Sequence, residues 1–570
     1  SNSWSQKEGV SRTYDGDGGV FDSFDEVEVS NNIDLSGLLS FSLNIGNNTF
    51  ESVTLASRVS ESSAQTLDGI DGDEARASAR HTIEWSEQQF ISQQFLGEHQ
   101  LGDSLIFTWQ ATGSQASRYA PDRREVRFDL AAANAGVYHL EVPSLLRRYD
   151  DLVDDNTDAS FDFSYETEFD TGWYLTSVFD FGAQAISRER DSDSNSYGYF
   201  GGLFIDDDAS DLLVSDVLTT ASVTGDQSTG YAFSDKTLAS DSYEAEMDLT
   251  SIYFSADTTI EEAVQIIVGA RYDSFEQTTD TFSLTQIDPS TGDFAAVQAV
   301  LEEDVTLPSL ALNWFYGFDQ QLRFAWSKTV SRPDFKEASN AVFYDTDFSD
   351  IRVRGNPNLE ISSITNLDLR WEYYGESQDK LSIAAFYKEI TDAIERVELT
   401  ASGTAGNSRT FQNTDKAEIS GIELDGYKEF ALNDSYTKSL FIALNASFIE
   451  SETEDADNPT SSRALQGQPE YTFNLILGYD DLDRGQELTL LFNQNGPSIR
   501  DVGISGKPDI IEEPVPQLNL TYSLDINERL SFSAKATNIL DAKVEFSQFG
   551  KPFREYSKGV GLEAGIEWDF

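Results

Sequence analysis

Apolar and polar residues alternate along most of the chain. Clear runs with an apolar residue at every second position begin at Leu39, Val264, Tyr471, Leu518 and Leu530. The intervening positions are mostly Ser, Thr, Asn, Gln, Glu, Lys or Gly. Because successive side chains of a strand point to opposite faces of a sheet, each run predicts a β-strand with one apolar and one polar face. No convincing amphipathic helix interrupts the runs, so we expect an all-β chain.

The connections between the predicted strands alternate in length. Starting near Val27, the alternation indicates roughly 19 strands. Short turns lie at residues 45–48, 101–104, 168–171, 256–259, 317–321, 375–378, 432–435, 481–486 and 525–529. Long segments lie between them, at about 61–79, 120–157, 190–237, 278–300, 332–362, 397–408, 453–464 and 503–511. Every second connection is therefore a tight hairpin, and the others are long, polar and rich in Asp, Ser and Gly.

This asymmetry distinguishes two all-β architectures. A transmembrane β-barrel has short turns on one side, long loops on the other, and strands that alternate lipid-facing apolar with lumen-facing polar residues. Soluble β-sandwiches also alternate, but their loops do not sort by parity over this many hairpins. We therefore expect a transmembrane antiparallel β-barrel, closed because an unpaired strand edge in lipid leaves backbone groups without partners.

Composition narrows the functional classes. The 570 residues carry a formal net charge of -61 and include no Cys. The charge argues against binding nucleic acid, whose phosphates require Lys and Arg, and against an anionic membrane surface. The absence of Cys excludes disulfides and thiol chemistry. Aromatic residues make up 12% of the chain, too many for a disordered acidic chain, and no run of about 18 apolar residues predicts a transmembrane helix.

Six stretches of the chain carry recognisable motifs: LRFAWSKTVSRPDF (322–335), RGNPNLEISSITNLDLRWEYY (354–374), LSIAAFYKEITDAIERV (381–397), FQNTDKAEISGIELDG (411–426), LSFSAKATNILDAKVEF (530–546) and the end, FREYSKGVGLEAGIEWDF. Together these stretches resemble the barrel of TonB-dependent outer-membrane receptors. The order and spacing of the Arg-Pro, Gly-Asn-Pro-x-Leu, Phe-Tyr-Lys, Gly-Ile-Glu and Asn-Ile-Leu motifs are specific, whereas any one of them alone is not. The resemblance is strongest over about residues 260–570.

The resemblance implies a 22-stranded barrel filled by an N-terminal plug domain. Counting back from the last strand makes residues 27–570 strands 4 to 22 of the family barrel. Residues 1–26 are then expected to be an outer loop with the remnant of an early strand, and the plug is expected to be missing. The chain opens SNSWSQ, without an initiator Met, a basic region or an apolar stretch. We therefore expect a fragment or a processed chain.

Some residues of the family motifs are interpreted as mainly structural. They are Arg332, Pro333, Gly355, Asn356, Pro357 and Asn538. The first five lie where a strand gives way to a long outer loop, and Pro and Gly there fix turns and end the strand pairing. Direct ligand contact is the alternative interpretation.

The last strand has apolar residues at its even positions, from Val560 to Phe570. In a barrel these positions face lipid, with Trp568 and Phe570 in the aromatic girdle at the periplasmic interface. The terminal Phe570 resembles the signal by which outer-membrane proteins are recognised for barrel insertion. The resemblance therefore implies the barrel-assembly machinery as a partner of this strand.

Aromatic residues of the long outer segments are the candidate ligand contacts, because aromatic rings can stack on sugars or on planar iron-chelating groups. They are Tyr119, Tyr197, Tyr199, Phe200, Phe204, Phe343 and Tyr344. Packing of the loops on themselves is the alternative interpretation. Arg and Lys are sparse in these segments, which mildly favours a neutral ligand over an anionic ferric chelate.

Asp-rich runs are the candidate calcium sites, because Ca²⁺ prefers about six to eight oxygen ligands. They lie at 15–19, 68–74, 150–158, 191–195 and 206–208. None has the spacing of an EF-hand loop, and a solvated acidic face is the favoured interpretation. No other cofactor is expected.

Catalysis is not expected. The three His residues, His81, His99 and His139, lie in different segments without metal-binding spacing. The sequence GISG at 503–506 lacks the pattern of a nucleophile elbow.

As the resemblance implies, the intact protein would import a scarce large solute, a ferric siderophore or an oligosaccharide, across the outer membrane of a Gram-negative bacterium. The TonB complex would act through the missing plug, and outer-membrane lipid and lipopolysaccharide would surround the barrel. The alternative is a non-transporting barrel that serves docking, adhesion or a structural role.

Overall fold

The structure is a computed structural model in which a single sheet dominates. It describes residues 2–72, 76–130, 138–170, 172–201, 223–225, 231–288, 290–291, 293–317, 319–345, 351–375, 379–399, 408–454, 462–503 and 507–568. In this part of the chain the sheet contains 27 strands. The α-helix α2 (Phe335–Ala338) and the 3-10 helix η2 (Ala239–Asp241) are short. Neither is long and apolar enough to cross a membrane.

The long strands pair in chain order and form the main ladder of the sheet. They are β1 (Asn2–Tyr14), β2 (Val20–Ile45), β3 (Asn48–Asp71), β4 (Arg76–Gln100), β5 (Leu105–Leu130), β6 (Tyr138–Asp170), β7 (Tyr174–Gly201), β9 (Tyr243–Ile260), β10 (Val264–Ile287), β11 (Phe294–Tyr316), β12 (Gln320–Ser331), β15 (Ser362–Tyr374), β16 (Lys380–Leu399), β17 (Ser408–Ala431), β18 (Lys438–Glu454), β19 (Tyr471–Asp481), β20 (Gln486–Asn495), β23 (Gln517–Asn527), β24 (Leu530–Thr537) and β27 (Gly561–Trp568). All neighbours in this ladder are antiparallel, as expected.

The remaining described strands are short and lie in the outer connections. They are β8 (Tyr231–Asp235), β13 (Val342–Asp345), β14 (Ile351–Arg354), β21 (Ser498–Asp501), β22 (Ile510–Glu512), β25 (Val544–Gln548) and β26 (Lys551–Ser557). These strands and β1 account for the difference from the roughly 19 strands expected by alternation. Residues 1–26, expected to be a loop with the remnant of a strand, contain β1 and the start of β2.

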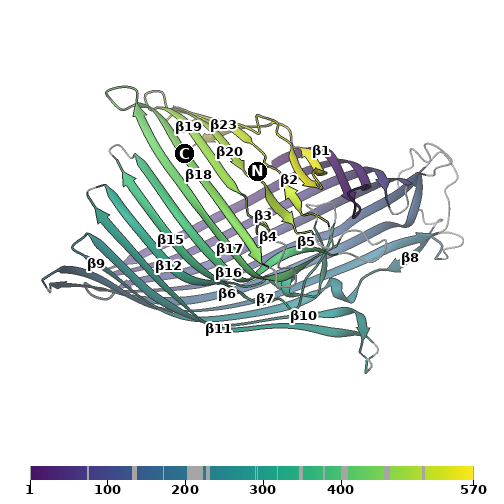
Figure 1. The fold of residues 1–570 in the computed structure, drawn as a ribbon, viewed down its shortest axis with the longest axis horizontal. Coiled ribbons are helices and arrows are strands. Elements are labelled where there is room, and N and C mark those ends of the chain that lie inside the picture. The colour runs from purple at the N-terminus through teal and green to yellow at the C-terminus, as the bar shows by residue number, and fades with distance from the viewer. Residues whose placement is uncertain are drawn as a thin grey trace.

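The sheet curves so that its purple N-terminal strands lie behind the green and yellow C-terminal strands (Figure 1). The two ends of the chain meet where Glu8–Ser11 of β1 pair with Arg554–Ser557 of β26. This contact is short: within the described residues, β27 pairs with β24 and not with β1 or β2. The expected closure is therefore present in the outer part of the sheet.

The tight turns lie at or near their predicted positions, except that the turn predicted at 256–259 lies at 261–263, because β9 continues to Ile260. The first joins β2 to β3 through the pair Ile45 and Asn48, with Gly46 at φ 60°. A positive φ at this position is the geometry of a two-residue hairpin turn, and glycine adopts it without a steric cost. Every residue of β2 from Ser23 to Ile45 then has a partner on β3.

The outer connections are shorter than expected. β5 continues to Leu130, β6 begins at Tyr138 and β7 continues to Gly201, so most of 120–157 and the start of 190–237 are strand. Polar composition suggested loops there. Outside a membrane, however, water can solvate both faces of a strand, so a polar run remains compatible with sheet pairing.

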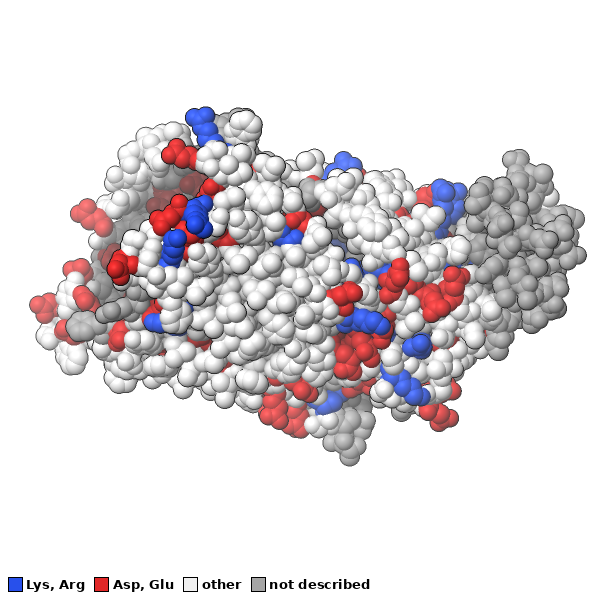
Figure 2. All heavy atoms as spheres, turned by 90° about the horizontal axis from the view of Figure 1, so that it is seen from above, with Lys and Arg blue, Asp and Glu red and all other residues white. Residues whose placement is uncertain are grey.

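The outward face of the ladder is apolar. Ile252, Phe254, Leu367 and Leu369 are each at least 41% exposed. Figure 2 shows few charged residues over the middle of the visible face and more of them toward its ends. This distribution is that expected of strands that present a band to lipid.

Buried apolar clusters occur where outer segments pack on the strands. Tyr243, Ala245, Phe335 and Ala341 form one such cluster, with Met247 beside it. It fixes α2 against β9, and thereby positions the site described next.

Candidate functional site

The strands β6 and β7 are far longer than a membrane requires. They contain 33 and 28 residues, whereas about 9 to 11 residues suffice for a strand to cross a bilayer. Their outer portions therefore stand above the apolar band. The segment that contains α2 and β13 packs against them, because Asp334 at the start of α2 accepts a hydrogen bond from Arg190 of β7.

Two adjoining cavities lie between this segment and the strands. Their volumes are about 390 Å³ and 160 Å³. Arg123, Arg148 and Asp241 line both, so we treat them as one space and call it the basic chamber. Its ten basic residues, counted among the described ones, are Arg80, Arg118, Arg123, Arg127, Arg147, Arg148, Arg190, Lys236, Lys336 and Arg352. Its five carboxylates are Glu84, Glu125, Asp150, Asp151 and Asp241.

The charge balance of the chamber is the reverse of that of the chain. The whole sequence has 100 acidic and 39 basic residues, yet basic residues outnumber acidic ones by two to one around this space. A cavity lined by one sign of charge focuses the electrostatic field and concentrates ligands of the opposite sign. The chamber therefore suits an anion.

Single carboxylates hold the arginines in pairs. Glu84 lies 2.9 Å from Arg118 and 3.2 Å from Arg123. Glu125 lies 2.7 Å from Arg127 and 3.9 Å from Arg80. Each carboxylate neutralises one of its two guanidinium groups, so each pair keeps a net positive charge and a fixed orientation. Guanidinium groups held in this way offer planar pairs of N–H donors to a ligand carboxylate, phosphate or phenolate oxygen.

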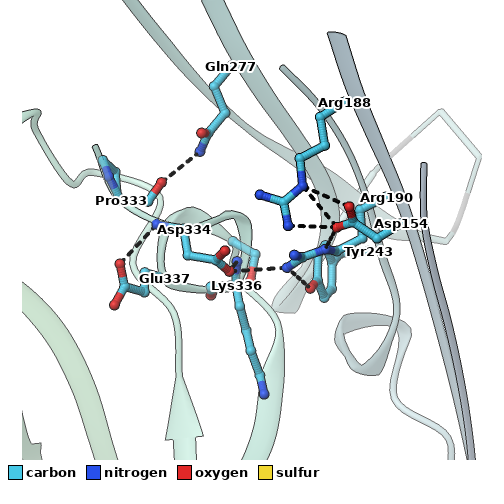
Figure 3. A network of polar contacts seen from close by, with 10 residues as sticks. Asp154, Arg188, Arg190, Tyr243, Gln277, Pro333, Asp334, Lys336 and Glu337 are labelled. Carbon is cyan, nitrogen blue, oxygen red and sulfur yellow. Dashed lines mark hydrogen bonds and ion pairs between the residues drawn. The ribbon is translucent and has the colours of Figure 1, made fainter. Parts of the chain in front are cut away.

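A third shared carboxylate, Asp154, anchors the wall beside α2. It accepts hydrogen bonds from Arg188 at 2.8 Å and from Arg190 at 2.5 Å, and Arg190 also donates to Asp334 at 3.1 Å (Figure 3). Both guanidinium groups lie over the ring of Phe335, at 5.0 and 5.1 Å from its centroid. These contacts are cation–π interactions that add to the ion pairs. Together these contacts join α2 to β7, and β7 to β6.

Of the aromatic candidates, Phe343 lines the chamber. Tyr119 is adjacent to Arg118, which lines the chamber, so the alternation of β5 places the two side chains on opposite faces. Tyr119 is 48% exposed and contacts the ring of Trp85 edge-on.

Tyr197 and Tyr199 form an aromatic cluster with Phe233 of β8. Their ring centroids lie 5.3 and 5.5 Å from that of Phe233. Ser192 and Ser194 of the same strand line the chamber, so the odd-numbered tyrosines point to the other face of β7. Packing of the outer segments on one another accounts for these contacts.

Two further aromatic candidates lie in paired strands of the outer segments. Phe200 of β7 pairs through its backbone with Ala232 of β8, and Tyr344 of β13 pairs with Arg352 of β14. Phe204 and the terminal Phe570 lie outside the described residues.

The Arg-Pro motif joins a strand end to α2. Arg332 lies 3.2 Å from Asp273 and 3.4 Å from Glu303, and its guanidinium lies 4.4 Å from the ring centroid of Phe275. The carbonyl of Pro333 accepts a hydrogen bond from Gln277 (Figure 3). The first residues of the outer segment are thus fixed to β10 and β11.

The Gly-Asn-Pro motif closes around the other end of α2. The N–H of Gly355 donates to the carbonyl of Ala341 at 3.1 Å, and the N–H of Asn356 donates to that of Glu337 at 2.7 Å. The side chain of Asn356 also donates to the carbonyl of Phe411 at 2.9 Å. Pro357 lies in the turn that follows. These residues shape the backbone beside the chamber and are not among those that line it.

Asn538 shapes a turn far from the chamber. Its backbone has φ 50°, and its side chain donates to the carbonyl of Gly559 at 2.9 Å and accepts from the N–H of Ala542 at 3.2 Å. It therefore connects the ends of β24 and β27.

The basic residues of the chamber were missed by sequence reasoning. They come from several strands and from loops distant in the sequence, so no local run of Lys or Arg announced them. Alternation along a single strand did not announce them either, because Arg118 and Arg123 have opposite parity and lie on either side of a register shift between Ala120 and Arg123. The scarcity of Arg and Lys in the predicted loops favoured a neutral ligand. That argument no longer holds, because most of the basic residues of the chamber lie on strands.

Calcium remains a prediction for the Asp-rich runs. Within the described residues no group of three or more His, Cys, Asp or Glu is arranged to hold a metal ion. The run at 206–208 lies outside the described residues. Asp150 and Asp154 of another run are bound to Arg148 and to Arg188 and Arg190.

Curated relatives match part of the chain. The iron-regulated outer membrane virulence proteins of two Vibrio cholerae strains are 25% identical to it over 219 residues, which is 37% of this chain. The chain spans about a third of their length in these matches, 32%.

Solved structures share the fold over nearly the whole chain. The siderophore receptor PiuA from Acinetobacter baumannii has a TM-score of 0.57 and 12% identity, and the match covers 99% of this chain and 81% of that one. The ferric yersiniabactin uptake receptor FyuA from Yersinia pestis has a TM-score of 0.56 and 13% identity, with 100% and 80% covered. At these identities the likeness shows the fold.

The family itself is shown by sequence. The model of the TonB dependent receptor-like β-barrel matches residues 31–539, which is most of the chain. The match confirms the resemblance carried by the motifs and the outer-membrane location that it implied. The chain belongs to the TonB-dependent receptor β-barrel family.

Proposed function

We propose that this chain is the barrel of an active importer and that its solute is an anionic ferric chelate. The observation that carries the proposal is the basic chamber, with ten basic and five acidic residues in a chain of net charge -61. Such a concentration of paired guanidinium groups has a cost in self-repulsion, which an anionic ligand relieves. A neutral oligosaccharide would gain nothing from it.

The comparisons support iron as the cargo. The Vibrio cholerae relatives are named iron-regulated, and PiuA and FyuA are named for a siderophore and for ferric yersiniabactin. In the proposed cycle the chelate enters the outer end of the barrel and binds in the chamber. The TonB complex, acting through a plug domain, then opens the path inward. The barrel binds and releases the chelate, and no bond of the solute is changed.

The other partners belong to the same proposal. Outer-membrane lipid and lipopolysaccharide surround the apolar outer face. The barrel-assembly machinery recognises the last strand, which contains β27.

Uptake of a labelled chelate tests the proposal. Cells that produce the full-length protein, as their only receptor of this family, are given radioactive iron as a tris-catecholate complex, which is a polyanion. We expect accumulation that stops when a protonophore dissipates the proton-motive force. Binding without accumulation would favour a docking role, and induction by a glycan with no response to iron would favour an oligosaccharide.

A further inference from the structure

Lys336 occupies a distinct place in the basic chamber. It lies on α2, whose first turn is closed by Asp334 and Glu337 in a reciprocal capping box. Its neighbour Phe335 is 2% exposed and packs beneath Arg188 and Arg190. Figure 3 shows the side chain of Lys336 extending away from the Asp154 network, and it lines the larger cavity. The helix is thus fixed while the lysine reaches into the space for the ligand.

The ammonium group of Lys336 has no carboxylate partner among the described residues. It lies over the ring of Phe343, 3.8 Å from the centroid. The nearby carboxylates have other partners: Glu84 pairs with Arg118 and Arg123, and Asp334 with Arg190. Lys336 is half-buried, and an ammonium group partly removed from water without a counter-ion costs free energy that a ligand anion can reduce.

Four basic and four acidic groups surround Lys336 in the larger cavity. The charged and titratable groups around the larger cavity are Glu84 on β4, Arg118 and Arg123 on β5, Arg148, Asp150 and Asp151 on β6, Arg190 on β7, Asp241 on η2 and Tyr243 on β9. Burial, with Arg118 as the next cause, lowers the pKa of Lys336 to about 8. Burial also raises the pKa of Asp241, which lines the same cavity.

We propose that Lys336 is the specificity-determining contact for the anionic groups of the solute, and that binding of the anion is coupled to proton uptake at this residue. The proposal rests on the function proposed for the chamber. An anion beside the ammonium group favours its charged form, so the bound state holds the proton more tightly than the free state. By linkage, a bound proton strengthens anion binding to the same extent.

The protonation of Lys336 determines how the affinity for an anionic chelate changes with pH. Below about pH 8 the lysine is already charged, so binding takes up no proton and affinity is highest. Above that pH the free lysine is neutral and must gain a proton to bind the anion. The affinity for an anionic chelate therefore falls as pH rises, until the pKa of the bound state is passed.

Titration calorimetry of the full-length protein in detergent micelles tests this. The probes are the ferric tris-catecholate complex and a neutral ferric tris-hydroxamate complex, each titrated at about pH 7 and about pH 9 in two buffers of different ionisation enthalpy. The variants are Lys336→Met and Lys336→Arg. The control is Lys428→Met, which removes a half-exposed lysine that pairs with Asp379 near a short turn. Unfolding midpoints show that each variant is folded.

The expected results distinguish the role of Lys336 from that of the other residues of the chamber. Lys336→Met weakens catecholate binding at about pH 7 by about tenfold or more, as loss of a charged hydrogen bond does, and leaves hydroxamate binding unchanged. The wild type takes up about one proton at about pH 9. Lys336→Arg retains affinity and takes up none. Lys428→Met behaves as the wild type.

Two different outcomes would each overturn a different proposal. In the first, the wild type binds the catecholate complex normally, but Lys336→Met binds it equally well or Lys336→Arg still takes up a proton. This outcome refutes the role of Lys336 and leaves the function proposed for the chamber intact. In the second, the wild type binds the polyanion and the neutral chelate with equal affinity. This outcome refutes the function proposed for the chamber and, with it, the role of Lys336.

Discussion

A few residues set the position of the ligand-facing lysine without touching a ligand. Gly355 is the clearest, because a Cβ atom there would lie 2.3 Å from the carbonyl oxygen of Ser339 and 2.4 Å from that of Lys336. Both obstacles are backbone atoms and cannot rotate away. The glycine of the Gly-Asn-Pro motif is thus required for close approach of two backbone segments, and the lysine depends on it.

Gly355→Ala is expected to shift α2 and weaken chelate binding. Overpacking of this kind costs about 1–3 kcal/mol of unfolding free energy, and the displaced Lys336 loses its place in the chamber. The matched control is Gly37→Ala, because a Cβ at Gly37 meets no atom within 4 Å. Calorimetric affinity and urea unfolding check the pair. Equal behaviour of the two variants would contradict the role given to Gly355.

At the scale of elements, outer segments are fastened to the strands by buried ions. Asp501 of β21 lies 2.6 Å from Arg396 of β16 and 2.7 Å from Arg409 of β17. Arg409 and Asp501 are fully buried. One carboxylate therefore holds β21 against two strands, much as Asp154 of β6 binds two arginines of β7.

Asp501→Ala is expected to release β21 and destabilise the outer rim. It leaves the buried guanidinium of Arg409 and the partly buried one of Arg396 without their shared partner, and breaking a buried pair costs about 3–5 kcal/mol. Hydrogen exchange should rise in β21 and β22 and remain low in β18 and β19, away from the rim. The exposed Asp434, in a short turn, gives the control Asp434→Ala. Unchanged protection of β21 would show that Asp501 does not hold this segment.

At the scale of the molecule, the period-two alternation, as in the run that begins at Leu39, predicted the strands of the apolar band, and the alternating lengths of the connections predicted the barrel. The period-two alternation was also enough to show that Tyr119 and Arg118 face opposite ways, once the strand was known to continue past them. The chamber could not be predicted in this way. Its cations are brought together by the curvature of the sheet and by α2, and alternation carries no information about which distant strands meet.

The contact between the first strands of the sheet and β26 also depends on particular side chains. Arg554 of β26 and Glu26 of β2 form a pair at 2.6 Å with both side chains buried. Glu26 also accepts a hydrogen bond from Gln65 at 2.8 Å, and Tyr14 donates to the carbonyl of Pro552 at 2.6 Å. These contacts join β1 and β2 to β26 beside the short β1–β26 pairing.

Arg554→Met is expected to weaken this closure by about 3–5 kcal/mol, because Glu26 stays buried without its counter-ion. The double variant Glu26→Gln with Arg554→Met should recover much of the loss, since no buried charge is left unpaired. The exposed pair of Lys543 and Glu555 provides the comparison: Lys543→Met should cost less than about 1 kcal/mol. Urea unfolding in lipid vesicles measures all three. A single variant no less stable than Lys543→Met, or a double variant no more stable than the single, would show that the ion pair does not close the sheet.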